Sequence, residues 1–292
     1  MQPNNQNIPR NTFRNRPRQT VENRPADGSG HKSAGNYTRP EPSEKETPDL
    51  LRQIRTAIRQ YPILNTVYLY TIRIFIWLFL GSIGWVIVLK YIPVWVTPLV
   101  VSRKLDAMGD DKSAKVYKKW RSLDEISREA ALAVVASEDQ QFPVHWGFDF
   151  DEIQDAIKEN KTRKRPRGAS TISQQVAKNV FLWNGRSYIR KGLEVYFTVL
   201  IELIWGKKRI LEVYLNVAET GPLTFGVEAA SQRYYGHTAK LLSRDEAARI
   251  AAVLPNPIKF SIQNPSAYIL RRTRQISRQM RALGGQKYLK NL

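Results

Sequence analysis

Residues 130–149 read AALAVVASEDQQFPVHWGFD, an apolar helical run followed by two adjacent carboxylates and a loop rich in aromatic residues. The carboxylates are Glu138 and Asp139. A carboxylate at the end of an apolar helix loses solvation, which raises its pKa and suits it to general acid or base chemistry. A solvated helix end, in which a carboxylate is only a cap or turn acceptor, is the structural alternative. This stretch alone does not decide between them.

The composition limits the classes of function. The 292 residues predict one main domain with extensions. There is no cysteine, which excludes disulfides and cysteine-based metal sites or nucleophiles, and three histidines make a histidine-rich metal site a poor fit. A net charge of +20 favours an anionic partner: nucleic acid, anionic lipid or a phosphorylated substrate.

The chain is organised around one apolar segment. Residues 1–60 are rich in Asn, Arg, Pro, Gly and Ser and predict a disordered basic tail. Residues 74–89, IFIWLFLGSIGWVIVL, carry no charge. With the apolar residues on both sides, they predict a transmembrane helix and a membrane-proximal segment over residues 66–101. A buried core helix is the alternative.

The flanks of this segment predict its orientation. About sixty polar residues precede it and no small-residue cleavage site follows, so we expect an uncleaved signal anchor. Arg52, Arg55, Arg59 and Arg73 favour a cytoplasmic N-terminus. The domain that follows then lies outside the cytoplasm. Nucleic acid is a poor partner there, whereas an anionic lipid substrate is a good one.

After Lys104 the pattern predicts helices throughout, so the expected fold class is mainly α. Capping boxes are the clearest signals of helix starts. They are expected at Ser122 with Glu125 (opening a helix to Glu138), Asp149 with Glu152, Thr171 with Gln174, and Ser243 with Glu246. The remaining predicted helices are 187–205 with Gly206 as its stop, 207–219, 226–235, and one from 264 to 284.

Two further motifs carry candidate chemistry. Residues 168–179 join a glycine turn to a helix N-terminus, where backbone NH groups could hold an anion or sugar hydroxyls, unless the segment is only a capped helix. Arg190 and Lys191 precede Glu194 by four and three residues, so the three head groups share one helix surface. This cluster is either a cationic site for a diphosphate or a solvated set of ion pairs. The basic loop 160–168 has the same two interpretations.

In their order along the chain these motifs resemble the family 51 peptidoglycan glycosyltransferases, and the length resembles the monofunctional members. The matching residues are Glu138-Asp139-x-x-Phe142-x-x-His145-x-Gly147, Gly168-x-Ser170-Thr171-Ile172-x-Gln174-Gln175-x-x-Lys178-Asn179, Arg190-Lys191-x-x-Glu194, Ile210-Leu211-Glu212-x-Tyr214-Leu215-Asn216, and Glu246-Ala247-Ala248 with Leu254-Pro255-Asn256-Pro257. The resemblance implies a lysozyme-like helical head with a smaller membrane-embedded jaw, over residues 102–285. Ala169 and Arg209 depart from the family pattern, which often has Gly and an acidic residue there.

The resemblance also implies roles. Glu138 would be the general base, and Glu194 a second glutamate assisting the leaving diphosphate. The diphosphate would contact Lys178, Arg186, Arg190 and Lys191, and the sugar and peptide groups would contact Ser170, Gln174 and Gln175. Supporting roles would fall to Asp139, His145 and Asn179. No organic cofactor is expected, and a divalent cation at the diphosphate is left open.

The implied reaction polymerises a lipid-linked disaccharide-peptide into β-1,4 glycan strands, with inversion and release of undecaprenyl diphosphate. The expected partners are that precursor, the growing glycan strand, membrane lipids and, left open, cell-wall synthesis or division proteins. The expected location is the bacterial cytoplasmic membrane, with the catalytic domain on its periplasmic side.

Two rivals remain: a lysozyme-like lytic enzyme, and a non-enzymatic membrane scaffold. The cations near Glu194 argue against the lytic enzyme, because cleavage has no diphosphate to stabilise. A bifunctional penicillin-binding protein is excluded by content, since SxxK occurs only at residues 29–32 and KTG is missing from the sequence.

Overall fold

The computed structural model describes residues 52, 53, 56, 61–109, 115–163, 168–185, 187–290 and 292. The chain divides into two units, residues 1–62 and 63–292. Nearly all of the first unit, and with it the predicted tail 1–60, lies outside the described residues. Arg186 and residues 164–167 of the basic loop 160–168 also lie outside them.

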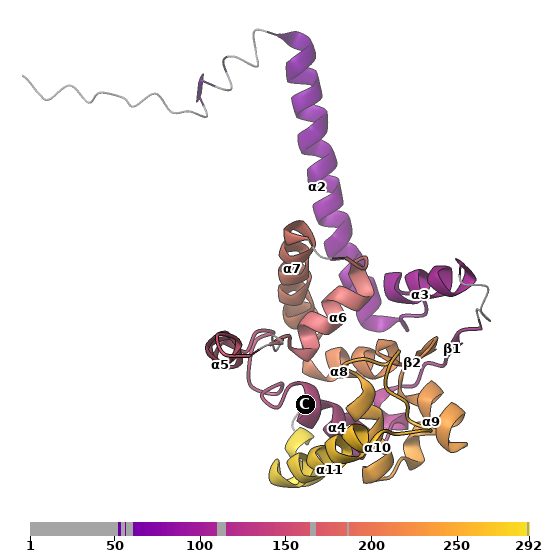
Figure 1. The fold of residues 1–292 in the computed structure, drawn as a ribbon. Helices are drawn as coiled ribbons and strands as arrows, with labels where there is room; N and C mark the ends of the chain where they lie inside the picture. Colours follow the sequence, from indigo (N-terminus) through magenta and orange to yellow (C-terminus); the bar gives the residue numbers. More distant parts are fainter. Residues whose placement is uncertain are drawn as a thin grey trace, which may run out of the picture. The chain divides into compact units, whose positions relative to one another are not determined.

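The described part of the chain is mainly helical, which confirms the predicted fold class (Figure 1). Its longer helices are α2 Pro62–Tyr91, α3 Pro98–Gly109, α4 Arg128–Glu138, α5 Phe150–Asn160, α6 Ile172–Phe181, α7 Tyr188–Ile204, α8 Gly206–Val217, α9 Val227–Tyr235, α10 Arg244–Val253 and α11 Ala267–Ala282. Three short 3-10 helices are η1 Leu123–Glu125, η2 Ala239–Leu241 and η3 Gly285–Leu289.

Helix α2 has the length and composition of a membrane span. Its 30 residues extend over ~45 Å, more than the ~30 Å of a bilayer core. The most apolar 18-residue window within Ile63–Tyr91 has a mean hydropathy of 2.2, and most side chains of the stretch are exposed rather than packed against the rest of the protein. A core helix would be buried, so the exposed apolar surface favours the membrane interpretation. The helix also starts earlier than the predicted 66.

The C-terminal end of α2 is held by side chains from α7 and α8. The last carbonyls of a helix have no partner within it. One turn before these terminal carbonyls, Val86 O receives a hydrogen bond at 2.7 Å from the indole NH of Trp205, the residue between α7 and α8. Arg209 on α8 donates from Nη2 to Leu89 O at 2.8 Å and also to Ile92 O. Arg209, the departure from the family pattern, is therefore a cap for the apolar helix.

Helix α4 lies in the centre of the remaining helices and packs against α10 and α11 (Figure 1). All of Ala130–Ala136 is buried. The small alanines allow neighbouring helices to approach closely, while Leu132 and Val135 fill the space between them. The C-terminus of α4, which carries Glu138, is thereby fixed by a close-packed core.

The start of α4 differs from the prediction. The capping box of Ser122 and Glu125 exists, but it opens only the single turn of η1. Helix α4 begins at Arg128, and the side chain of Ser127 accepts a hydrogen bond from Glu129 N at 3.2 Å. Two serines, each followed by an acidic residue, compete as helix caps here, and the second caps the longer helix.

Three short strands were not predicted. They are β1 Tyr117–Lys118, β2 Glu219–Gly221 and β3 Thr224–Phe225, in the order β1-β3-β2. β1 is parallel to β3, and β2 is antiparallel to β3 with an irregular register. Strands of two or three residues are too short to show an alternating pattern. The helix predicted over 207–219 ends at Val217, and Glu219 begins β2 instead.

Candidate active site

Glu138 is the last residue of α4 and lines a cleft of about 850 Å³. Its Oε2 accepts a hydrogen bond from Gln175 Nε2 on α6 at 3.0 Å. Gln175 in turn accepts one from the buried Tyr214 hydroxyl at 3.1 Å. This chain of hydrogen bonds fixes the Glu138 carboxylate while leaving it on the cleft wall.

The pKa of Glu138 is raised above its ordinary value, chiefly because burial disfavours the charged form. The hydrogen bond from Gln175 and the positive charge of Arg272 act in the opposite direction, and burial outweighs them. A carboxylate with a raised pKa that still reaches a cleft is suited to accept a proton from a substrate hydroxyl.

Asp139 fastens the end of α4 to the start of α6. Its Oδ2 accepts from Ile172 N at 2.9 Å, and its Oδ1 lies 2.9 Å from His145 Nε2. His145 Nδ1 accepts from Gly147 N at 3.1 Å, so Nε2 carries the proton and donates it to Asp139. Both side chains are occupied by these contacts, as the supporting roles expected for them require.

The start of α6 separates the predicted binding residues into two groups. Thr171 and Gln174 form the expected capping box, with Thr171 N donating to Gln174 Oε1 at 3.0 Å. Gln174 is buried in that cap and does not line the cleft. Ser170 and Gln175 do line it. The structure thus places Gln174 in the support of the helix start rather than on the cleft wall.

A second cleft, of about 420 Å³, is lined by two of the predicted cations, whereas Lys191 is not among its lining residues. Lys178 and Asn179 of α6 line it together with Arg190 of α7. Gln175 and Pro255 line both clefts, so the space beside Glu138 adjoins the space beside the cations. A substrate that occupied both would place one end against a base and the other against positive charge.

Glu194 lies beneath these cations and is only 3% exposed. Arg190 Nη1 donates to its Oε2 at 2.9 Å, and Lys191 Nζ donates to its Oε1. Burial is the main cause that lowers the pKa of nearby Lys178; Glu194 opposes this shift, whereas Arg190 and Lys191 add to it. The expected shared surface is confirmed, but the buried Glu194 does not match the solvated cluster that was the alternative.

The Glu194 carboxylate is already engaged by cationic side chains. Both carboxylate oxygens of Glu194 are taken by Arg190 and Lys191, and the surrounding charge is positive. Nowhere in the described ranges do three or more His, Cys, Asp or Glu side chains gather as metal ligands would. The cationic side chains that line the adjoining cleft are Arg103, Lys178 and Arg190.

Several side chains at the clefts carried no sequence signal. Arg272 of α11 lines the Glu138 cleft and donates to Ser137 O at 3.2 Å. Arg103 of α3 and Glu219 of β2 form an ion pair at 2.9 Å on the wall of the cationic cleft. Arg272, Arg103 and Glu219 each lie far along the chain from the sequence motifs that they contact. The spacing of residues in the sequence therefore could not reveal these contacts.

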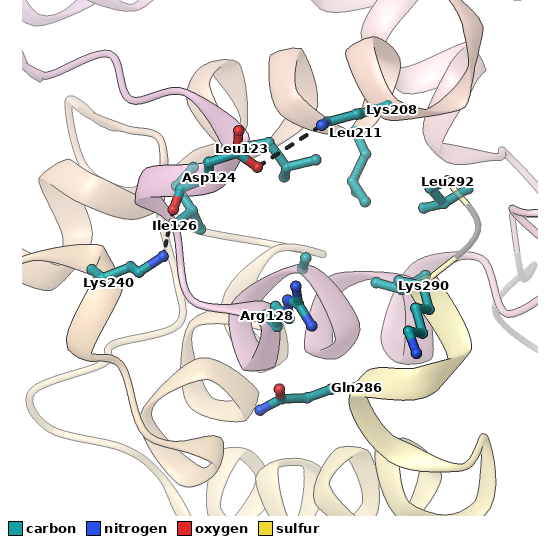
Figure 2. A pocket seen from close by; sticks show the side chains of 12 residues that line it. Leu123, Asp124, Ile126, Arg128, Lys208, Leu211, Lys240, Gln286, Lys290 and Leu292 are labelled. Carbon is teal, nitrogen blue, oxygen red and sulfur yellow. Dashed lines mark hydrogen bonds and ion pairs between the residues drawn. The ribbon is translucent and has the colours of Figure 1, made fainter.

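A separate pocket of about 390 Å³ lies between η1, the start of α4, α8 and η3 (Figure 2). Figure 2 shows Leu123, Ile126 and Leu211 among its lining side chains, with Lys208 reaching toward Asp124. The Lys208 Nζ and Asp124 Oδ1 atoms are 3.9 Å apart. None of the predicted site residues lines this pocket. It is distinct from the two clefts.

The structure described so far is a helical domain in which a cleft with Glu138 adjoins a cleft lined by cations. Comparison with known proteins identifies the class to which this domain belongs. The transglycosylase family model matches residues 105–281. The chain belongs to the transglycosylase family.

Similar proteins carry one name. A biosynthetic peptidoglycan transglycosylase of Pseudomonas entomophila (strain L48) is 50% identical over 220 residues, which cover 75% of this chain and 93% of the relative. The protein of that name from Chromohalobacter salexigens is 48% identical over 225 residues, 76% of this chain and 96% of the relative. The one from Pseudomonas putida (strain KT2440) is 50% identical over 220 residues, which cover 75% of this chain and 93% of the relative.

Proposed function

We propose that this protein is a membrane-anchored peptidoglycan glycosyltransferase that polymerises lipid-linked disaccharide-peptide units into β-1,4 glycan strands. The observation that carries the proposal is the meeting of two clefts at Gln175 and Pro255, one with Glu138 and the other with Lys178 and Arg190. The family and the names of its relatives supply the substrate class.

The reaction places the acceptor sugar beside Glu138 and the donor beside the cations. Glu138 takes the proton from the acceptor 4-hydroxyl as that oxygen bonds to C1 of the donor sugar. The bond from C1 to the diphosphate oxygen breaks on the opposite face, and its electrons leave with undecaprenyl diphosphate, so the anomeric centre inverts. Gln175 holds the carboxylate toward the acceptor.

The leaving group gathers negative charge as it departs. Arg190 and Lys191 are held before the reaction by their ion pairs with Glu194, so little reorganisation of these two cations is needed to stabilise that charge, and Lys178 adds its own from α6. Glu194 acts here by holding Arg190 and Lys191 in place. Arg186 joins this group by resemblance alone.

The anchor and topology complete the proposal. With α2 in the bilayer and the arginines before it cytoplasmic, the clefts lie on the extracytoplasmic side, where the lipid-linked substrate ends its passage. The membrane concerned is the bacterial cytoplasmic membrane. The other partners of the protein are the growing glycan strand and the surrounding lipids. Whether it also binds cell-wall synthesis or division proteins is left open.

The test is polymer formation by the full-length protein in detergent with lipid-linked disaccharide-peptide. Glu138→Gln should fold and bind substrate yet polymerise at least ~10²-fold more slowly, the scale of a general base. Asp155→Asn, a similar change at an exposed site on α5 outside both clefts, should behave as the unchanged protein. Near-normal polymerisation by folded Glu138→Gln would refute the mechanism.

The same assay separates the rivals. A lytic enzyme would shorten added glycan strands and leave the lipid-linked substrate unused. A scaffold would bind without turnover, and its binding would not depend on Glu138. Net growth of polymer from the lipid-linked substrate excludes both as the main activity.

A further inference from the structure

Helix α3 brings an additional cation to the donor side of the cleft. Arg103 lines the cationic cleft, as do Lys178 of α6 and Arg190 of α7. α3 packs against α6, and Asn184 Nδ2 after α6 donates to Ser102 Oγ at 2.9 Å (Figure 1). The cleft is therefore lined by positive charge from three different helices, of which α3 directly follows the membrane segment.

Glu219 fixes the orientation of this arginine. Arg103 Nε donates to Glu219 Oε2 at 2.9 Å. The Glu219 side chain is 5% exposed, whereas that of Arg103 is 35% exposed. A guanidinium held at Nε has a fixed plane, and its terminal Nη1 and Nη2 groups make no hydrogen bond within the part of the chain that the structure describes. Two parallel donors in one plane match the oxygens of a phosphate.

We propose that Arg103 binds the diphosphate of the lipid-linked donor through its terminal NH groups, and that Glu219 is the residue that positions it. This inference rests on the proposed function. The diphosphate would lie between Arg103 on one wall and Lys178 and Arg190 on the other. Binding of the donor would draw α3 and the α6–α7 pair together, because the anion neutralises cations that otherwise repel one another.

The ion pair with Arg103 also explains how the Glu219 carboxylate is accommodated in a buried position. Burial raises the pKa of this carboxyl, whereas the charge and hydrogen bond of Arg103 lower it. A carboxylate buried at this position is stabilised chiefly by Arg103, and removing either partner leaves the other uncompensated. The pair is thus a preformed unit in which one residue contacts substrate and the other sets its direction.

The experiment measures diphosphate binding and polymerisation separately in the full-length protein. Farnesyl diphosphate is the binding probe, and farnesol, which has no phosphate, is its control. Arg103→Gln should weaken farnesyl diphosphate binding and raise KM for the lipid-linked donor by about 10-fold or more, the scale of a charge-assisted contact. Farnesol binding should not change. Lys104→Gln, the same charge change on the exposed neighbouring residue, should leave all three measurements unchanged.

Two further variants test the positioning role. Arg103→Lys keeps the charge but cannot reach Glu219 and a phosphate with one planar group, so its binding should lie between those of the unchanged protein and Arg103→Gln. Glu219→Gln should raise KM with a smaller change in kcat. The double variant Arg103→Gln/Glu219→Gln should be no worse than Arg103→Gln, because Glu219 acts only through Arg103.

The outcomes are separable. If folded Arg103→Gln or Arg103→Lys matches Lys104→Gln in both binding and KM, the proposal is wrong. Additive losses in the double variant would overturn the positioning role of Glu219. If the unchanged protein binds farnesyl diphosphate through Arg103 but forms no polymer, the anion site stands and the proposed function falls.

Discussion

Glu138 is subject to two opposing demands. The proposed general-base role needs an ionised carboxylate in contact with substrate, whereas the surroundings of Glu138 at the end of α4 favour the neutral form and raise its pKa. Such conflicts are common where a site trades stability for reactivity. Both sides of the conflict can be measured.

The first prediction concerns the pH dependence of turnover. A general base must be deprotonated, so kcat/KM for polymerisation should fall as pH decreases, with a midpoint above the ordinary value of 4.5 for a glutamate. Gln175→Ala removes a hydrogen bond that favours the charged form, so the midpoint should move further upward. A midpoint at or below 4.5 would show that another group limits the rate. The measurement is a pH–rate profile with folding checked at each pH.

The second prediction concerns stability. Because the folded-state pKa of Glu138 is raised, the protonated carboxyl is compatible with folding, and stability is lost as pH rises through the unfolded and then the folded pKa. Glu138→Gln removes this loss. Its melting temperature should equal or exceed that of the unchanged protein above neutral pH, and the difference should vanish below about pH 4. A lower melting temperature at pH 8 would contradict the burial argument.

The third prediction separates the two cations at Glu194. The Lys191 side chain is 48% exposed, so Lys191→Ala should lower turnover while costing only ~0–1 kcal/mol of stability, the range of an ion pair whose cation reaches solvent. Arg190 is 13% exposed, and its loss leaves a buried carboxylate less compensated. Arg190→Ala should therefore lower turnover and also cost about 1–3 kcal/mol. Equal melting temperatures of the two variants, by thermal denaturation, would contradict this difference.

At the scale of elements, local signals predicted helices well and short strands not at all. Thr171 and Ser243 open helices where their capping boxes predicted, and α7 ends at Ile204, two residues before the predicted stop at Gly206, which begins α8. The box at Ser122 was misassigned because a cap fixes where a helix starts but not how long it continues. The strands depend on pairing across the fold, which has no local pattern.

The fourth prediction tests one close approach between elements. Gly226, between β3 and α9, has φ +85°, and a Cβ there would lie 2.8 Å from Asn216 O. Gly236, after α9, has a similar φ of +78° but open space around it. Both changes to Ala incur backbone strain of about 1 kcal/mol, and Gly226→Ala should cost several kcal/mol more because backbone must move. Similar free energies of unfolding for the two variants would show that the α8–β3 contact is soft.

The candidate site was predictable only where its residues share an element. Arg190, Lys191 and Glu194 meet because of helical spacing, and this was expected from the sequence. The hydrogen bond from Gln175 to Glu138 joins two named motifs, yet its existence depends on how α4 and α6 pack. Arg103 and Arg272 reach the clefts from α3 and α11, and arginines are too frequent in this chain to single them out. The catalytic and binding roles of the named residues stay predictions.

At the scale of the molecule, the fifth prediction concerns topology. Alkaline phosphatase, which is active only after export, should be active when fused after Leu292, while a green fluorescent protein at the same position should stay dark. The reason is the concentration of arginines before α2. The reversed pattern would place the clefts in the cytoplasm and remove the substrate assignment with them.

The cap on α2 by Trp205 and Arg209 has a consequence for the distance between clefts and membrane. An anchor joined by a flexible linker would let the catalytic part rise and tilt freely. Here the end of α2 is bonded to Trp205, which follows α7, and to Arg209 of α8, so with α2 in the bilayer as proposed its depth would fix the height of the proposed diphosphate site. The lipid tail holds the substrate diphosphate at one level of the interface. The contact of Trp205 and Arg209 with α2 would therefore keep the proposed diphosphate site at the same distance from the bilayer as the substrate diphosphate.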